Sequence, residues 1–276
     1  MRKKNKKKKI VILGGSGFIG ASLYKELSPY YDTRASYCHN EEKKNNQHFF
    51  RYDMQDDDVV AVLKQYKPDI IISALRGDFA AQIQAHMHLV EYVQTHSVKL
   101  LFMSSANVFD AYSKFPSYEF DKTLSQSVYG RLKIKIENAL LRLPPEKTAI
   151  LRLPMVFGKG SPRVKEIRQA LHEKEAIEVF PNLIINVTHD DRLSQQVHYL
   201  INRNLNGVFH LGSKDLVLHE EFIKELIQTL GNYHPNLKRV YTTNDDRYLA
   251  ALPKYNPLPD YLQAQVQEVI QHHQLV

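Results

Sequence analysis

The stretch Lys9-Ile10-Val11-Ile12-Leu13-Gly14-Gly15-Ser16-Gly17-Phe18-Ile19-Gly20 decides the fold of this chain. It reads as a short apolar strand that runs into a glycine-rich turn and then into a helical pattern, Ala21 to Leu27. Strand, tight turn and helix in this order present backbone N–H groups at a helix N-terminus, where they can hold a pyrophosphate. Gly14 allows the sharp turn, Gly17 lets the backbone approach a phosphate, and Gly20 lets the helix pack on the strand. The spacing is Gly-x-x-Gly-x-x-Gly, so a turn that only packs well stays an alternative.

The composition is that of a globular protein. The chain has 276 residues, 43% hydrophobic and 24% charged, which is enough for one large α/β domain or for a domain with a smaller lobe. It has no apolar run long enough to span a membrane and no secretory signal. The single cysteine, Cys38, excludes an internal disulfide and a multi-cysteine metal site. The cytoplasm is therefore the expected compartment.

The net charge of +7 comes from the N-terminus. Seven basic residues lie within 2–9, and the remainder carries 30 Lys or Arg against 30 Asp or Glu. Like charges repel and this tail has nothing to bury, so residues 1–9 are interpreted as a flexible basic tail. The location of the charge removes the argument for a specific nucleic-acid partner.

Short apolar strands alternate with helical patterns through the first half of the chain. The expected strands are 33–37, 48–53, 70–74, 99–103 and 148–152, and the expected helices are 56–66, 80–95 and 129–143. Asp56 or Asp57 suits the N-cap of the first of these helices. The alternation predicts βαβ units and a doubly wound parallel sheet of the Rossmann type.

The second half is less regular. We expect a Rossmann domain over 10–160 and a smaller substrate-binding lobe over 161–276, with helices near 162–174, 191–203 and 219–230. A strand near 207–211 is expected to return to the Rossmann sheet, and 253–259 reads as a loop. In such sheets ligands bind outside the carboxyl ends of the strands.

A second motif is Ser127-Val128-Tyr129-Gly130-Arg131-Leu132-Lys133. Tyr129 and Lys133 are four residues apart and share a helix face. A nearby ammonium lowers the pKa of a phenol and makes proton transfer practicable at neutral pH. Ser105 follows a buried strand, where its hydroxyl can bind a substrate carbonyl. An ordinary helix and a serine that closes a local turn are the alternatives.

These motifs, with Ser105-Ala106-Asn107-Val108-Phe109 and Leu151-Arg152-Leu153-Pro154-Met155-Val156-Phe157-Gly158, resemble the extended short-chain dehydrogenase/reductase family. Within it, the chain is most similar to the dTDP-4-dehydrorhamnose reductases and their sugar-nucleotide-binding relatives. The resemblance covers residues 10–160 well and 161–276 only loosely.

The resemblance implies a dinucleotide site and a catalytic set. Catalysis would fall to Ser105, which polarises the carbonyl, to Tyr129 as the general acid, and to Lys133, which binds the nicotinamide ribose and lowers the pKa of the tyrosine. The implied cofactor-binding residues are Gly14, Gly17, Phe18, Ile19, Gly20, Asp53, Met54, Ala74, Leu75, Tyr129 and Lys133. Hydride would come from the nicotinamide, and no metal is expected.

Several positions depart from the family pattern. Cys38 stands where an acid often binds the ribose of NAD, so the cofactor is NADP or NAD, with a slight preference for NADP through Arg34, Lys43 or Lys44. The family's asparagine on the helix after the fourth strand has no clear counterpart, and Gln82 or Gln84 is nearest. The acid of its Thr-Asp pair is replaced by Ala106, and its substrate-strand tryptophan by Met155.

The resemblance therefore implies an NAD(P)-dependent reductase of a keto group on a nucleotide sugar or another small carbonyl compound. A nucleotide-sugar 4-epimerase would use the same three catalytic residues. A non-catalytic NAD(P)-binding regulatory subunit of the same fold is the third reading. A homodimer that pairs helices 80–95 and 129–143 is compatible with the sequence, which does not establish it.

Overall fold

The computed structural model describes residues 7–112, 114–231 and 233–272. The chain divides into two compact units, each discontinuous in sequence. The first contains residues up to Ser104 together with 132–151 and 197–208, and the second contains 105–131, 152–196 and 209 onward. This division differs from the boundary expected at residue 160. Segments 105–131 and 152–160 belong to the second unit, and segment 197–208 belongs to the first. No described helix has the length and hydrophobicity to cross a bilayer.

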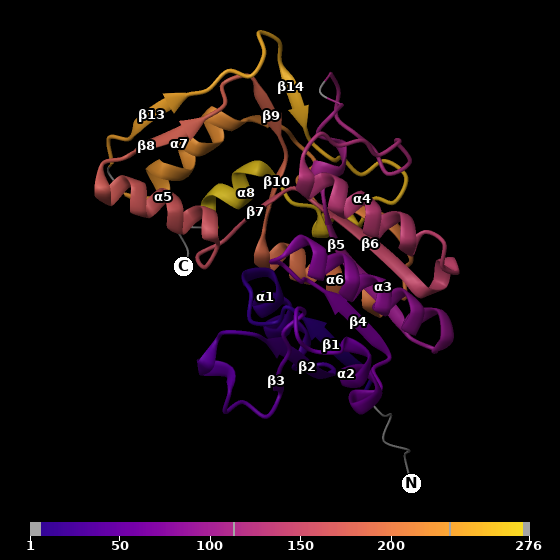
Figure 1. The fold of residues 1–276 in the computed structure, drawn as a ribbon. Coiled ribbons are helices and arrows are strands. Elements are labelled where there is room, and N and C mark those ends of the chain that lie inside the picture. Colours follow the sequence, from indigo (N-terminus) through magenta and orange to yellow (C-terminus); the bar gives the residue numbers. More distant parts are fainter. Residues whose placement is uncertain (1–6, 113, 232, 273–276) are drawn as a thin grey trace. The chain divides into compact units, whose positions relative to one another are not determined.

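The first unit is built on a parallel sheet (Figure 1). Its seven strands are β1 (Lys9–Leu13), β2 (Asp32–Tyr37), β3 (Phe49–Arg51), β4 (Ile70–Ser73), β5 (Lys99–Ser105), β6 (Thr148–Leu153) and β11 (Gly207–His210). Their order is β11-β6-β5-β4-β1-β2-β3. The pairings of β1 with β2 and β4, of β2 with β3 and of β4 with β5 are all parallel. The strand order reverses between β1 and β4, which is where doubly wound sheets bind their ligands.

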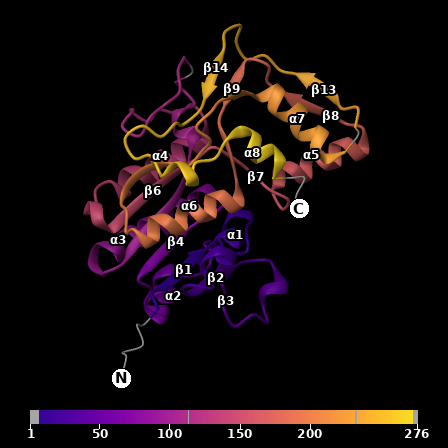
Figure 2. The same cartoon turned by 180° about the vertical axis from the view of Figure 1, so that it is seen from behind.

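Helices cover both faces of this sheet. One apolar cluster joins α2 (Val59–Tyr66), α3 (Phe79–Thr95) and α4 (Val128–Leu140) to alternate residues of the central strands, among them Val11, Ile71 and Phe102. Figure 2 shows α1 (Phe18–Leu27) and α6 (Asp190–Asn202) on the other face, where His198 Nδ1 lies 2.6 Å from Glu26 Oε1. The predicted Rossmann-type sheet is confirmed. Buried apolar runs such as Ile70–Ser73 form its centre because both faces are covered.

The predicted elements of the first unit are found within a few residues, with two differences. The N-cap of α2 is Asp58, whose carboxylate accepts from Val60 N at 2.8 Å, rather than Asp56 or Asp57. Asp57 instead accepts from Asp53 N at 2.7 Å. Lys9, expected in the tail, begins β1. Residues 1–6 of the expected flexible tail lie outside the described residues.

The second unit has small sheets that sequence periodicity did not predict. β7 (Met155–Phe157) pairs with β10 (Val187–His189), and β8 (Ala176–Val179) with β13 (Asn236–Arg239). β9 (Leu183–Ile185) lies between β12 (Val217–Leu218) and β14 (Arg247–Leu249). Its helices include α5 (Pro162–Glu173), α7 (His219–Leu230) and α8 (Val266–Gln271). The core of the unit gathers around Phe157 and Phe222, whose rings lie 4.7 Å apart.

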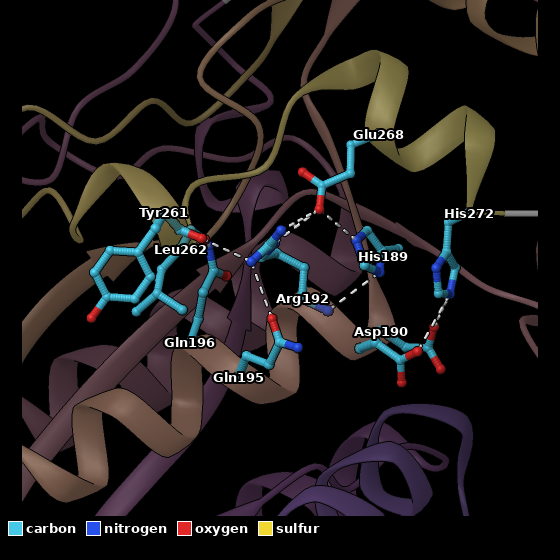
Figure 3. Close-up of polar contacts among 10 residues, drawn as sticks. His189, Asp190, Arg192, Gln195, Gln196, Tyr261, Leu262, Glu268 and His272 are labelled. Atoms are coloured by element: carbon cyan, nitrogen blue, oxygen red, sulfur yellow. Dashed lines mark hydrogen bonds and ion pairs between the residues drawn. The ribbon is translucent and has the colours of Figure 1, made fainter. Parts of the chain in front are cut away.

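Helix α8 is tied to the start of α6 by charged groups (Figure 3). Arg192 donates to Glu268 through Nε at 3.1 Å and through a second nitrogen, and it donates to Tyr261 O at 2.9 Å. His189 Nε2 lies 3.4 Å from the same Glu268 oxygen. The ring of His272 stacks on that of His189, with 4.1 Å between ring centres. Arg192 thus joins α6 to Glu268 of α8 and to the backbone at Tyr261.

Candidate active site

The glycine-rich turn is held against the loop that follows β4. Gly14 has φ of +80°, and a Cβ there would lie 2.5 Å from Ala74 O. A Cβ on Gly20 would lie 2.1 Å from Gly14 O. Neither position therefore has room for a side chain, so both glycines are required by the fold itself.

Gly17 differs from these two. A Cβ on Gly17 would meet only Gly14 O, at 3.3 Å, so packing does not demand glycine there. Gly17 is the N-cap of α1, and no side chain caps this helix. The first N–H groups of α1 thus receive no hydrogen bond from a capping side chain, as a phosphate-binding helix start requires. This arrangement fits the pyrophosphate of a dinucleotide, with Phe18 and Ile19 in the first turn of the helix.

The other predicted cofactor-binding residues follow neighbouring strands of the first unit. Asp53 and Met54 come directly after β3, and Ala74 and Leu75 directly after β4. Ala74 N donates to Leu13 O at 2.9 Å, next to the glycine turn. A Cβ on Gly77 would lie 2.7 Å from Met54 Cε, so the segments after β3 and β4 are in contact. The structure brings this set to one edge of the sheet. Its role in cofactor binding stays a prediction.

The end of β2 lies beside the carboxylate of Asp53, and the sequence did not predict this pairing with Cys38. Cys38 Sγ donates to Asp53 Oδ2 at 3.2 Å. Burial, helped by Asp53, raises the pKa of the Cys38 thiol to about 11, whereas a backbone hydrogen bond from Gln55 lowers the pKa of Asp53. An acid from β3 therefore lies beside the position where NAD-binding proteins place one on β2.

The cations expected to favour NADP are engaged elsewhere. Arg34 donates to Gln47 O, Lys43 lies over the ring of Phe49, and Lys44 pairs with Glu41 at 3.6 Å. The contacts of Arg34 and Lys44 are exposed to solvent, so NADP or NAD remains the expected cofactor, with the slight preference for NADP.

Lys133 is almost fully buried, with 4% of its surface exposed. Its ammonium donates to Met103 O at 3.0 Å and lies 4.7 Å from the centre of the Phe102 ring. Burial lowers its pKa to about 8, and the charge of Glu137 opposes this shift. Tyr129 lies one turn earlier on α4 and is 37% exposed. One helix thus carries a phenol that can reach a ligand and, one turn away, a buried amine.

In the second unit, Ser105 and the start of α4 are packed together. Ser105, the last residue of β5, donates to Asn107 Oδ1 at 2.9 Å. A Cβ on Gly130 would lie 2.3 Å from Asn107 O. The residue after Tyr129 therefore touches the turn that begins at Ser105. The absence of a side chain at Gly130 permits this approach.

Some polar groups of the first unit were not predicted as site residues. Gln82 is buried, whereas Gln84 is exposed, so of the two candidates only Gln82 occupies an interior position on α3. Gln82 Nε2 donates to Gly77 O at 2.9 Å, and its Oε1 has no hydrogen-bond partner among the described residues. His86 lies one turn further, with Nε2 2.8 Å from Ser73 Oγ and Nδ1 2.6 Å from Gln82 O. The apolar periodicity of a helix in the sequence does not predict a buried hydrogen-bond network of this kind.

Two groups of residues bring three possible metal ligands together. They are Cys38, His39 and Asp53 in the first unit, and His189, Asp190 and His272 in the second (Figure 3). The raised pKa of Cys38 keeps its thiol protonated. His189 uses one nitrogen to accept from Arg192 N and faces Glu268 with the other. A metal would have to displace these bonds, and the absence of a metal from the reaction stays a prediction.

Three buried histidines predict acid sensitivity. Burial lowers the pKa of His86 to about 3, and that of His210 and His219 to about 4. Their imidazoles are neutral in the folded chain, whereas the unfolded chain takes up protons below about pH 6.5. The contribution of each neutral histidine to the free energy of unfolding is therefore complete above about pH 6.5. It falls below that pH, by about 2 kcal/mol per histidine at about pH 5.

Urea unfolding at about pH 7.5 and about pH 5 checks this. His219→Gln should make the difference between the two pH values smaller. His234→Gln should not, because His234 is exposed. Equal stability at both pH values would contradict the prediction.

The second unit contains a cavity of about 370 Å³. Met155 and Phe157 of β7, Ile167 of α5 and Ile177 of β8 form an apolar wall. Arg163, Glu166, Glu178 and His219 add polar groups. A mostly apolar wall with few polar groups is typical of a site for a small organic molecule. Met155 is the residue that replaces the tryptophan of the resembled reductases.

The family model described as the RmlD substrate binding domain matches residues 8–272. The chain belongs to this family. The match includes both compact units, so it extends through the C-terminal part that the motifs covered only loosely. The predicted resemblance is confirmed at the level of this family.

The individual relatives have low sequence identity to this chain. A dTDP-4-keto-6-deoxy-D-glucose reductase from Streptomyces niveus is 27% identical over 165 residues, which are 55% of this chain and 57% of that protein. This chain thus spans just over half the length of that relative. A dTDP-4-dehydrorhamnose reductase from Aggregatibacter actinomycetemcomitans is 23% identical over 236 residues, or 78% of this chain and 76% of that protein.

Solved structures confirm the fold. The dTDP-4-dehydrorhamnose reductase from Bacillus anthracis str. Ames, determined in complex with NADP, matches with a TM-score of 0.75 at 23% identity. The match covers 98% of this chain and 99% of that chain. At this identity the likeness establishes the architecture alone.

Proposed function

We propose that this protein is an NAD(P)-dependent reductase of a keto group on a nucleotide-activated sugar, of the dTDP-4-dehydrorhamnose reductase type. The observation that carries the proposal is that one family model spans residues 8–272, and so includes the glycine turn, the catalytic candidates and the cavity of the second unit. The relatives named above are reductases of dTDP-linked keto sugars. The single cysteine is compatible with the cytoplasm, which we keep as the proposed compartment.

The residues of the chain divide the work of the reaction. The open N-terminus of α1 binds the pyrophosphate, and Asp53, Met54, Ala74 and Leu75 lie along the rest of the dinucleotide. The bound cofactor supplies the hydride. Lys133 binds the nicotinamide ribose as an ammonium and favours the phenolate form of Tyr129.

Proton transfer and carbonyl binding fall to Tyr129 and Ser105. The Tyr129 phenol gives its proton to the oxygen of the ketone as that oxygen gains negative charge. The Ser105 hydroxyl donates a hydrogen bond to the same oxygen. Since Ser105 donates to Asn107 in this structure, its hydroxyl has to rotate when the substrate enters.

The substrate is proposed to place its nucleotide in the lobe, where the cavity lined by Met155 and Phe157 is large enough for a flat ring. Ala106 supplies no acid beside Ser105, and a sugar dehydratase would need one. This observation favours a reductase or an epimerase over a dehydratase. We also propose a homodimer, which none of the described contacts supports.

A cofactor-consumption assay tests the proposal. The purified protein is mixed with NADPH or NADH and dTDP-4-dehydrorhamnose, and loss of reduced nicotinamide is followed together with the sugar product. A reductase consumes one reduced cofactor for each sugar and releases it oxidised. In a parallel assay with a dTDP-sugar that carries a free 4-hydroxyl, such as dTDP-glucose, conversion to the 4-epimer without net oxidation, with cofactor retained through gel filtration, would assign an epimerase. Cofactor binding without any turnover of nucleotide sugars would assign the non-catalytic reading.

A further inference from the structure

The surroundings of Lys133 lower the pKa of its ammonium. Its ammonium contacts Met103 O and the face of Phe102, and it interacts electrostatically with Glu137, on α4 itself, and with Arg76, on the segment after β4. The charge of Arg76 favours the neutral amine, as burial does. The charge of Glu137 acts in the opposite direction and favours the ammonium.

Glu137 is as deeply placed as the lysine. It lies one turn beyond Lys133 on α4 and is 1% exposed. The hydroxyl of Ser104, itself 3% exposed, donates to its carboxylate. A carboxylate in such a place costs several kcal/mol of desolvation unless it is paired and hydrogen-bonded. Glu137 has the hydrogen bond from Ser104, and it interacts electrostatically with Lys133, four residues earlier on the same helix.

The remaining element packed here, α3, adds no charge. His86 of α3 interacts with Lys133 electrostatically, but its pKa of about 3 keeps it neutral at physiological pH. Burial and the charge of Arg76 thus favour the neutral amine, whereas the charge of Glu137 favours the ammonium. The Met103 carbonyl and the Phe102 ring also favour the ammonium, and Glu137 adds a full negative charge to their effect.

We propose that Glu137 is a positioning residue of the reaction: its buried charge keeps Lys133 protonated, and thereby sets the upper pH limit for cofactor binding and for proton transfer by Tyr129. The inference rests on the proposed function for the role of Lys133. The mechanism follows from the chemistry, because a neutral amine holds ribose hydroxyls less strongly and no longer stabilises a phenolate.

A binding titration without substrate tests this inference. The dissociation constant of NADPH is measured by fluorescence from about pH 6 to about pH 10 for the wild type, Glu137→Gln and Ser104→Ala. In the wild type, affinity should fall as pH rises through about 8, where Lys133 loses its proton. In Glu137→Gln the midpoint should move down by about one pH unit or more. Ser104→Ala removes a hydrogen bond but no charge, so its midpoint should move by less than half as much. Equal midpoints in the wild type and Glu137→Gln would overturn the proposal.

Two further variants separate charge from shape. Lys133→Met should weaken NADPH binding and remove the fall in affinity near pH 8, since the titrating group is gone. Glu137→Asp retains the charge and should keep a midpoint near that of the wild type, even if Glu137→Gln fails to fold. A shift in Glu137→Asp of a full pH unit would mean that the charge is not what matters, and would overturn the proposal. Because no sugar is present, a failure of the proposed substrate would leave these results unaffected.

Discussion

Replacing Tyr129 by phenylalanine is expected to lower kcat for reduction of the nucleotide-sugar ketone about 1000-fold, while NADPH binding stays within about threefold of the wild type. The phenol is the proposed proton donor, and phenylalanine retains its ring and packing without the proton. Steady-state rates and a fluorescence titration of NADPH on the same preparations measure the two quantities.

Tyr112→Phe is the matched control for this loss. Tyr112 belongs to the same unit and is as exposed as Tyr129, at 37% for each. Its replacement should leave kcat unchanged. A Tyr129→Phe protein that turns over at the wild-type rate on every active substrate would show that the catalytic assignment is wrong.

Alanine at Gly17 and at Gly20 is expected to separate cofactor binding from folding. A Cβ on Gly20 would lie 2.1 Å from Gly14 O and 2.7 Å from Gly15 Cα, so the backbone has to shift. Gly20→Ala should lose about 3 kcal/mol of unfolding free energy or more. Gly17 has a φ of −75°, which alanine adopts readily, and a Cβ there would have one close neighbour, at 3.3 Å. Gly17→Ala should therefore lower the free energy of unfolding by about 1 kcal/mol.

The two variants differ in what they do to the ligand. In Gly17→Ala the new methyl group occupies the space over the start of α1, and NADPH affinity should fall at least tenfold although the fold is kept. Urea unfolding and NADPH titration of each variant measure both effects. NADPH binding of wild-type strength in Gly17→Ala would contradict the placement of the pyrophosphate at this turn.

The sequence was informative where one short segment specifies both structure and chemistry. The run Ile70-Ile71-Ile72 could only be a strand buried on both faces, and the structure has it at the centre of the sheet. Tyr129 and Lys133 share a helix, so their relation depends on helical spacing alone. Such elements need no long-range information.

Features that depend on residues far apart in the chain were not predictable in the same way. Asp53 reaches Cys38 from another strand, and Ser104 reaches Glu137 from β5, so no local pattern announces either pair. The strands of the second unit are two to four residues long, too short for an alternating pattern to be distinguished from loop. β10 and β14, for example, are defined by their pairing partners rather than by their own residues.

The position of β11 has a consequence for synthesis on the ribosome. β11 is the edge strand next to β6, yet it is formed by residues 207–210, long after the other six strands have been made. A nascent chain that ends before this point holds a sheet whose β6 edge offers unpaired N–H and C=O groups to other chains. Until residues 207–210 have left the ribosome, the β6 edge therefore stays open to pairing with other chains.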